Sequence, residues 1–313
     1  MTSRIGLALA AGLLASLLFL SLAREMPNGS LLAFFAPLPL MAAGLGLGQW
    51  AAVLAAASGG AAAALVGGPT VAVTFLATAG LSALVVSNRA LLCRPAADGS
   101  VEWYPPGRVL AWLTLMSVGL FAFAAVALPH HPDGVKGWMT EVARRTLDVL
   151  GDEVAPQQRQ AMIVSLASVL PGMVMGVWLL MAAVNAVIGQ AILAASGRGR
   201  RPSPSYRTLD LPGWSVAAVA AAIVVAAAAE DGAGYLAANI VAVALLPFAA
   251  LGVATAHAHL AARPRAGLGL AVLYGILVVA FLWALIPAAG LGLAKFVQTR
   301  MRRSLAGGGG KEE

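Results

Sequence analysis

Long apolar stretches alternate with short polar segments along the 313 residues of the chain. About nine such stretches can be distinguished, and most Lys, Arg, Asp and Glu residues fall in the gaps between them. A helix of about 20 apolar residues crosses the hydrocarbon core of a bilayer and pairs its own backbone N–H and C=O groups, which lipid cannot do. The pattern therefore predicts an all-α fold, a polytopic transmembrane helical bundle of about nine spans within a range of about eight to ten.

Charged residues, glycine and proline bound the expected spans. The spans cover residues 5–23, 31–50, 51–66, 70–92, 109–128, 161–195, 214–229, 236–260 and 267–285. Gly67, Gly68 and Pro69 predict a turn between the third and fourth spans, and Pro171 predicts a kink in the overlong sixth. Residues 288–299 are only half apolar, so a crossing and a re-entrant segment both stay open there.

A more polar region between the fifth and sixth spans has the pattern of an amphipathic helix. From about 133 to 156, apolar residues recur at helical spacing opposite charged ones. Such a helix is too charged to insert and is expected to lie at the membrane interface, on the external side. We expect a single transmembrane domain over 1–304 that includes this helix, followed by a flexible Gly-rich tail over 305–313.

Composition and charge support a membrane location. Hydrophobic residues make up 60% of the chain and charged residues 11%, which leaves too little polar surface for a soluble fold. The net charge of +7 comes from Arg and Lys in short loops, as the positive-inside rule describes, and does not indicate nucleic-acid binding. With the N-terminus in the cytoplasm, ten arginines fall in cytoplasmic loops and five basic residues in external segments. The basic C-terminal end favours a cytoplasmic C-terminus in a bacterial inner membrane.

Motifs for enzyme chemistry are missing from the sequence. Cys93 is the single cysteine, so an intrachain disulfide is excluded. The glycine run that precedes Lys311 lacks the Ser or Thr and the strand–helix context of a phosphate-binding loop. Neither histidine pair has carboxylates at metal-ligand spacing. We therefore expect no metal, no cofactor and no enzyme activity; a lipid-handling enzyme, which would need a His or carboxylate cluster at one interface, is a less favoured alternative.

Polar residues inside or at the rim of the spans are the candidates for substrate binding, because such groups are costly unless they pair or face a cavity. The candidate set is Asn239, Tyr235, Thr70, Thr74, Glu230 and Asp231. For Asn239 the alternative is an interhelical hydrogen bond, and for Glu230 and Asp231 it is a solvated turn. Asn185 and Gln190 are further intramembrane polar groups, and for Asn185 the structural alternative is favoured.

Small residues four apart form stripes on several spans, which lets helix backbones approach closely. These residues are Ala8, Gly12 and Ser16, Gly44 and Gly48, and Gly172 and Gly176. They are candidates for a helix-packing or partner-docking face. Because alanine is so abundant in the spans, packing within the bundle is the competing explanation.

Several soft motifs occur in a recognisable order. A Pro-Leu-Pro-Leu segment at 37–40 leads into three alternating glycines, Asn239-Ile240 opens a later span that closes with residues 251–257, and residues 291–294 precede an arginine-rich end. Over nearly the whole chain this order resembles the YybS-like group of bacterial polytopic membrane proteins. That group is distantly similar to the S subunits of energy-coupling-factor transporters and to the cell-shape protein MreD.

The S-subunit likeness implies a helical bundle that binds a small metabolite and is energised by a separate ATPase and transmembrane module. S subunits have roughly six spans, so the longer span list here departs from that pattern, and a fold-level likeness alone does not establish function. The leading hypothesis is an S-subunit-like binder or transporter whose outward cavity is lined by the candidate set. The alternative is a non-transporting, MreD-like envelope scaffold. The lipid bilayer is the one partner that both hypotheses require.

Overall fold

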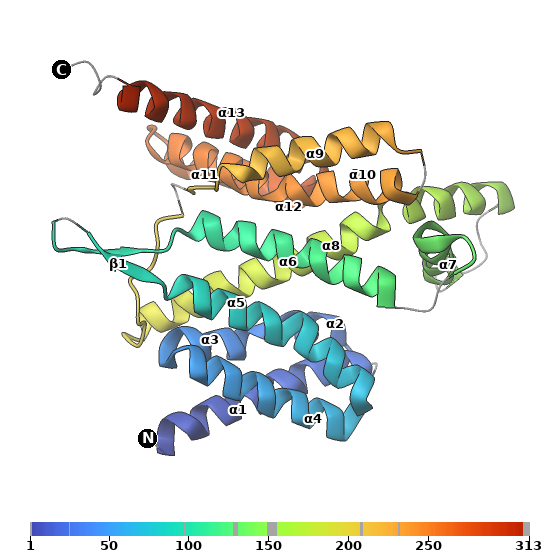
Figure 1. The fold of residues 1–313 in the computed structure, drawn as a ribbon, viewed down its shortest axis with the longest axis horizontal. Coiled ribbons are helices and arrows are strands. Elements are labelled where there is room, and N and C mark those ends of the chain that lie inside the picture. Colours follow the sequence, from blue (N-terminus) through green and yellow to red (C-terminus); the bar gives the residue numbers. More distant parts are fainter. Residues whose placement is uncertain are drawn as a thin grey trace. The chain divides into compact units, whose positions relative to one another are not determined.

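The computed structural model describes residues 2–24, 26–96, 98–127, 131–148, 155–206, 209–230 and 232–308. Most of them are helical, which confirms the helical class predicted from the sequence (Figure 1). Within these residues, 6 helices are long and apolar enough to cross a membrane, and α9 (Trp214–Ala228) and α12 (Ala266–Val279) are shorter apolar helices. The count of nine spans stays a prediction.

Two compact units make up the chain, and each is described by itself. Unit 1 comprises Met1–Leu120 and Met175–Pro204, and unit 2 comprises Phe121–Val174 and Ser205–Glu313. The helices α6 (Pro106–Ala127) and α8 (Pro156–Ala195) contribute residues to both. The single domain expected over 1–304 rests on an apolar pattern that is the same in both units, so the pattern gives no sign of this division.

Unit 1 consists of helices joined by short turns, together with one small hairpin. Its elements are α1 (Thr2–Ala23), α2 (Gly29–Phe34), α3 (Pro37–Leu47), α4 (Gln49–Phe75), the π-helical η1 (Leu76–Gly80), α5 (Leu81–Ala90), β1 (Cys93–Pro95), β2 (Val101–Trp103), α6 as far as Leu120 and α8 from Met175. The span expected over 31–50 is thus two short helices, because the chain breaks before Pro37.

The chain reverses inside α4, at the predicted glycine–proline turn. Gly68 has φ 84° and ψ 175°, a backbone conformation that suits glycine, and Pro69 lacks the N–H that a continuing helix needs. Gly60 and Leu76 lie eight residues before and after Gly68, and a Cβ on Gly60 would be 2.9 Å from Leu76 Cδ2. In one straight helix these residues would be about 24 Å apart, so the two halves fold back on each other.

The hairpin β1–β2 replaces part of what reads as a polar loop in the sequence. Cys93 pairs with Trp103, and Arg94 pairs with Glu102. The Arg94 Nε donates to Glu102 Oε2 at 2.7 Å. This hydrogen bond and the guanidinium charge hold the pKa of the exposed Glu102 carboxyl below its ordinary value. Strands of three residues are too short to leave a periodic signal in the sequence.

Unit 2 contains α7 (Gly134–Asp148), α8 as far as Val174, α9, α10 (Gly232–Ala244), α11 (Leu246–Ala261), α12 and α13 (Phe281–Gly308). The span expected over 236–260 is two helices that meet at Leu245, before Pro247. The span expected over 267–285 ends at Val279, because Ala280 leaves the helical region with φ −119° and ψ 41°. Residues 288–299 lie inside α13, which continues through part of the expected tail as far as Gly308.

The predicted amphipathic helix is α7, which is shorter than the expected range 133–156; residues 149–154 lie outside the described part. Its apolar face buries Met139, Ala143 and Leu147, and the last two pack with Ile163 and Ala167 of α8. The apolar face is therefore covered in part by protein. Its position at the membrane interface stays a prediction.

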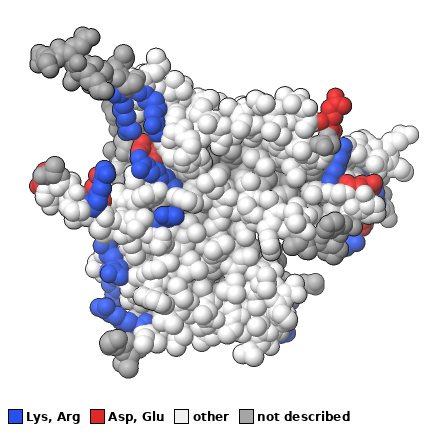
Figure 2. Space-filling view, in the orientation of Figure 1, with Lys and Arg blue, Asp and Glu red and all other residues white. Residues whose placement is uncertain are grey.

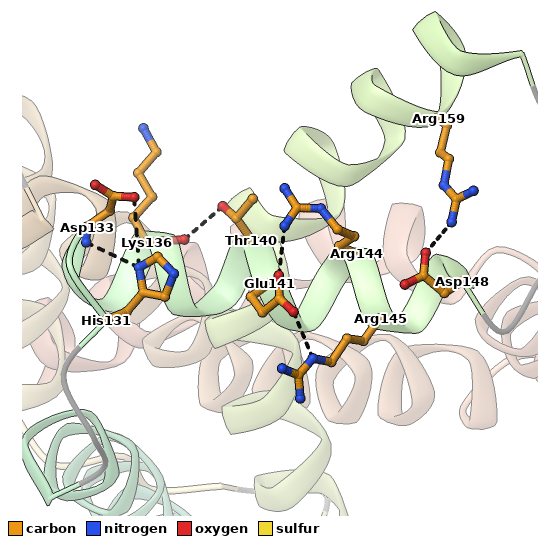
Figure 3. Close-up of polar contacts among 9 residues, drawn as sticks. All are labelled: His131, Asp133, Lys136, Thr140, Glu141, Arg144, Arg145, Asp148 and Arg159. Atoms are coloured by element: carbon orange, nitrogen blue, oxygen red, sulfur yellow. Dashed lines mark hydrogen bonds and ion pairs between the residues drawn. The ribbon is translucent and has the colours of Figure 1, made fainter.

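The opposite face of α7 carries ion pairs (Figure 3). Glu141 accepts hydrogen bonds from Arg145 Nε at 2.9 Å and from Arg144 Nη1 at 2.7 Å. These two guanidinium groups hold the pKa of the Glu141 carboxyl below its ordinary value, with Arg145 the larger cause. Asp148 at the end of α7 pairs with Arg159 of α8. The carboxylates of Glu141 and Asp148 are thus each paired with arginines within the helix pair.

The helices α11 and α13 pack at very short range in unit 2 (Figure 1). A Cβ on Gly252 would overlap the carbonyl of Ala288, and one on Gly292 would overlap the carbonyl of Phe248. Beside this contact, the rings of Phe248 and Phe296 meet edge to face with centroids 5.6 Å apart. Two glycines therefore set the distance between the backbones, and the phenylalanines fill the adjoining core.

Candidate functional site

Asn239 of α10 lies against α8 near Pro171. The side chain is 5% exposed. Its Nδ2 donates to the carbonyls of Ser168 and Tyr235, both at 3.0 Å, and its Oδ1 accepts from the backbone N–H of Gly172 at 2.8 Å. A Cβ on Gly172 would lie 3.0 Å from that Oδ1, so the glycine gives the amide room to approach. Both ends of the amide are bonded to backbone.

Tyr235 completes this arrangement one turn earlier on α10. Pro171 has no N–H, so the carbonyl of Ala167 loses the hydrogen bond that residue 171 would give in a regular helix. The Tyr235 hydroxyl donates to this carbonyl at 2.5 Å. Tyr235 thus supplies the hydrogen bond that α8 lacks at its proline, and Asn239 bonds to the backbone beside it. We refer to these two side chains and the α8 backbone at Ala167, Ser168 and Gly172 as the Pro171 clamp.

The Pro171 clamp contains two residues that were predicted to bind substrate. Asn239 and Tyr235 are brought together, but each of them bonds to helix backbone, which is the interhelical alternative considered for Asn239. A ligand at this place would have to displace those bonds. Direct substrate contact by the pair stays a prediction.

The other members of the candidate set lie elsewhere. Thr70 and Thr74 belong to unit 1 and are exposed, and the Thr74 hydroxyl donates back to the Thr70 carbonyl at 2.9 Å. Glu230 is exposed in unit 2, just after α9, and Asp231 lies outside the described residues. The candidate set is thus divided: Thr70 and Thr74 belong to unit 1, and the other members belong to unit 2.

In unit 1, two polar side chains of α8 donate hydrogen bonds to backbone carbonyls at places where other helices end or are irregular. Asn185 is fully buried, and its Nδ2 donates to the carbonyl of Phe34, where α2 ends, and to that of Met181, both at 2.8 Å. The indole N–H of Trp178 donates to the carbonyl of Thr78 inside η1 at 3.1 Å. Unpaired backbone carbonyls are costly in lipid, so both side chains stabilise helix interruptions. Trp178 was not among the residues expected from the sequence; its signal is an indole N–H inside an apolar span.

Arg201 is a buried arginine that sequence reasoning missed. The sequence places it in an Arg-, Pro- and Ser-rich segment between two expected spans, but its side chain is only 8% exposed. Its Nη1 donates to the carbonyl of Ala90 at 2.8 Å and to that of Tyr104 at 3.4 Å, and its own carbonyl accepts from Gln190 at 3.1 Å. Ala90 is the last residue of α5, where a cation compensates the exposed carbonyls and the helix dipole.

Arg201→Met is expected to lower the thermal stability of the purified protein by roughly 2 kcal/mol, because it leaves buried carbonyls without a charged donor. A thermal melt in mild detergent measures this loss. Arg198→Met, at an exposed position in the same segment, is the matched control and should have little effect. Equal losses in both variants would show that the charge of the segment matters and the hydrogen bonds of Arg201 do not.

The first small-residue stripe is covered by α4. Ala8 and Ser16 are each 1% exposed. A Cβ on Gly12 would overlap the Ala55 carbonyl and the Ser58 hydroxyl. This is the close helix packing that the stripe predicts, made within unit 1. Docking of a partner on this face would require α4 to move away.

The remaining small residues also lie at internal contacts or turns. Gly44 faces Ser87 of α5, and Gly48 has φ 110° at the turn between α3 and α4. Gly176 is half-buried in α8. In the part of the chain that the structure describes, His, Cys, Asp and Glu form no group of three or more that could hold a metal ion. The polar side chains of the apolar helices described above form their hydrogen bonds chiefly with backbone groups.

Comparison with known proteins identifies a family. Neither the search of curated proteins nor the search of solved structures returned a match. A model of the family described as "Predicted membrane protein (DUF2232)" matches residues 13–294, which includes both units. This match agrees with the apolar helices and with the polar side chains that bond to helix backbone inside them. The chain belongs to the DUF2232 family of predicted membrane proteins.

Proposed function

We propose that this integral membrane protein is an S-subunit-like binder or transporter of a small metabolite and works with a separate energising partner. The supporting observation is the number of apolar helical segments in unit 1. It gathers six apolar helical segments, which are α1, α2 with α3, α4 as far as the turn at Gly68, the returning end of α4 with η1 and α5, α6 as far as Leu120, and α8 from Met175. This matches the roughly six spans of the S-subunit pattern, and the helices in excess belong to unit 2.

The proposed ligand contacts in unit 1 are Thr70 and Thr74, at the start of the helix that returns after the Gly68 turn. Both are exposed, so their hydroxyls are accessible on this helix face. Asn239 and Tyr235 contribute to ligand binding in this proposal only if the clamp opens. Within unit 2, Glu230 and Asp231 are the proposed rim residues and α7 is the proposed lid.

We further propose that the protein lies in the bacterial inner membrane with both termini in the cytoplasm. Figure 2 shows basic side chains along the left edge of the view and a second group, in which basic and acidic side chains are mixed, at the right. In unit 1, Arg89 lies in the last turn of α5 and Arg201 bonds to the carbonyl at the end of that helix; in unit 2, Arg263 follows the end of α11 and Arg300 lies in the C-terminal part of α13. The positive-inside rule assigns such helix ends to the cytoplasm.

Native mass spectrometry of protein extracted in mild detergent tests the proposal. We expect a retained small molecule, a co-purifying ATPase module, or both. The double variant Thr70→Val and Thr74→Val should lose the small molecule at unchanged thermal stability. Thr255→Val on α11 is the matched control, because its hydroxyl likewise donates to the carbonyl four residues earlier, at 2.8 Å. Retention of the same molecule by the double variant would remove the two threonines from the proposed site.

The alternative function is a non-transporting envelope scaffold. It is favoured by the use of the Asn185 and Asn239 amides for bonds to helix backbone, which supports a static bundle. A scaffold should co-purify with envelope proteins, and it should carry neither a small molecule nor an ATPase module. That result would overturn the transport proposal and leave the scaffold.

A further inference from the structure

An open groove of about 500 Å³ lies between the end of α11 and the start of α12 in unit 2. Leu268, Val272 and Ile276 line its length, and Arg263 and Arg265 stand at one end. The described residues that line it include no Asp or Glu. The groove therefore joins a positively charged end to an apolar channel.

The helices that form the groove indicate where it lies in the membrane. Arg263 and Arg265 occupy the short connection between the apolar helix α11, which ends at Ala261, and the apolar helix α12, which begins at Ala266. Such a connection lies where the hydrocarbon core gives way to lipid headgroups. The N-terminus of α12 adds the positive end of its helix dipole at the same place.

The positions of the two arginines are defined by local structure. The Arg263 guanidinium lies 2.6 Å from the Nε2 of His259, one turn earlier on α11. Arg265 has φ 67° at the residue that precedes α12, so it sits directly at the helix start. Both guanidinium groups are on exposed residues.

We propose that this groove binds an anionic phospholipid of the surrounding leaflet, with its phosphate between Arg263 and Arg265 and an acyl chain along Leu268, Val272 and Ile276. Charge complementarity selects the headgroup, because a guanidinium pair recognises phosphate oxygens through planar, two-pronged hydrogen bonds. A soluble phosphate would use the arginines but would gain nothing from the apolar channel. The three apolar side chains are 67%, 54% and 52% exposed, so their surfaces are open to a chain from the bilayer.

Native mass spectrometry with defined lipids tests this proposal. The full-length protein in mild detergent is mixed with phosphatidylglycerol and phosphatidylethanolamine that carry identical acyl chains. The wild type is expected to retain phosphatidylglycerol preferentially. In the double variant Arg263→Gln and Arg265→Gln the preference should fall by roughly thirtyfold, about fivefold for each arginine.

Two further variants separate the groove from general surface charge. Val272→Trp keeps both arginines and fills the apolar channel, and it should also lower phosphatidylglycerol retention. Arg94→Gln removes an exposed arginine that is paired with Glu102 in unit 1, and it should retain the wild-type preference. Undiminished retention by either the arginine double variant or Val272→Trp would overturn the proposal. Inorganic phosphate that displaces the lipid completely would show a soluble-anion site and would overturn it as well.

Discussion

Gly252→Ala is expected to destabilise unit 2 by roughly 3 kcal/mol, the upper part of the range for overpacked cores. The added methyl group would occupy the position of the Ala288 carbonyl on α13, so the two helices would have to separate. Gly292→Ala should have a similar effect, because its methyl group would meet the carbonyl of Phe248. Thermal unfolding in mild detergent, followed by the loss of monodisperse protein, measures the change.

Gly275→Ala on α12 is the matched control for these two variants. A Cβ at Gly275 meets nothing within 4 Å, and alanine is the better helix former. This variant should equal or slightly exceed the wild type in stability. The double variant of Gly252 and Gly292 should lose less than the sum of the single losses, because one separation of the helices relieves both overlaps. Additive losses, or a control as unstable as Gly252→Ala, would contradict the close packing of α11 and α13.

Asn239→Leu is expected to cost roughly 2 to 3 kcal/mol of stability, since it removes the side-chain hydrogen bonds to the Ser168 carbonyl and the Gly172 N–H inside an apolar region. Tyr235→Phe should cost about 1 kcal/mol, because it removes the single hydroxyl that bonds to the Ala167 carbonyl. Thermal melts of both variants provide the measurement.

Pro171→Ala gives the sharper test of the clamp. Alanine restores the backbone N–H that the Ala167 carbonyl accepts in a regular helix, so Tyr235→Phe should cost much less in this background than in the wild type. Thr255→Val serves as a control for the loss of a hydroxyl elsewhere in unit 2. If Tyr235→Phe costs the same with and without Pro171, the tyrosine does not substitute for the missing N–H. If Asn239→Leu keeps full stability and loses a bound molecule, the residue belongs to a ligand site.

Features with a strong local cause could be predicted from the sequence. The apolar periodicity gives the helical membrane class, Gly68 and Pro69 give the reversal in α4, and the alternation of charge and apolar residues gives α7. Each of these depends on residues close together in the chain. Local composition therefore determines these features, independently of contacts between residues far apart in the sequence.

Features that depend on distant contacts could not be predicted. Arg201 carries the same charge as its exposed neighbours, and only the fold places it beneath the end of α5. Tyr235 and Pro171 are each visible in the sequence, but their relation through the Ala167 carbonyl requires α10 to lie beside α8. Ala280 ends α12 without glycine or proline at that position, so the start of α13 at Phe281 has no local signal.

The lengths of α9 and α12 have a consequence for the membrane around unit 2. These helices have 15 and 14 residues, and at 1.5 Å per residue they rise about 22 and 21 Å, against a hydrocarbon thickness of about 30 Å. A span that is too short for its bilayer is matched by local thinning of the lipid. Unit 2 should therefore be most stable among short-chain lipids, and thickening the membrane should impose a hydrophobic mismatch on these two helices first.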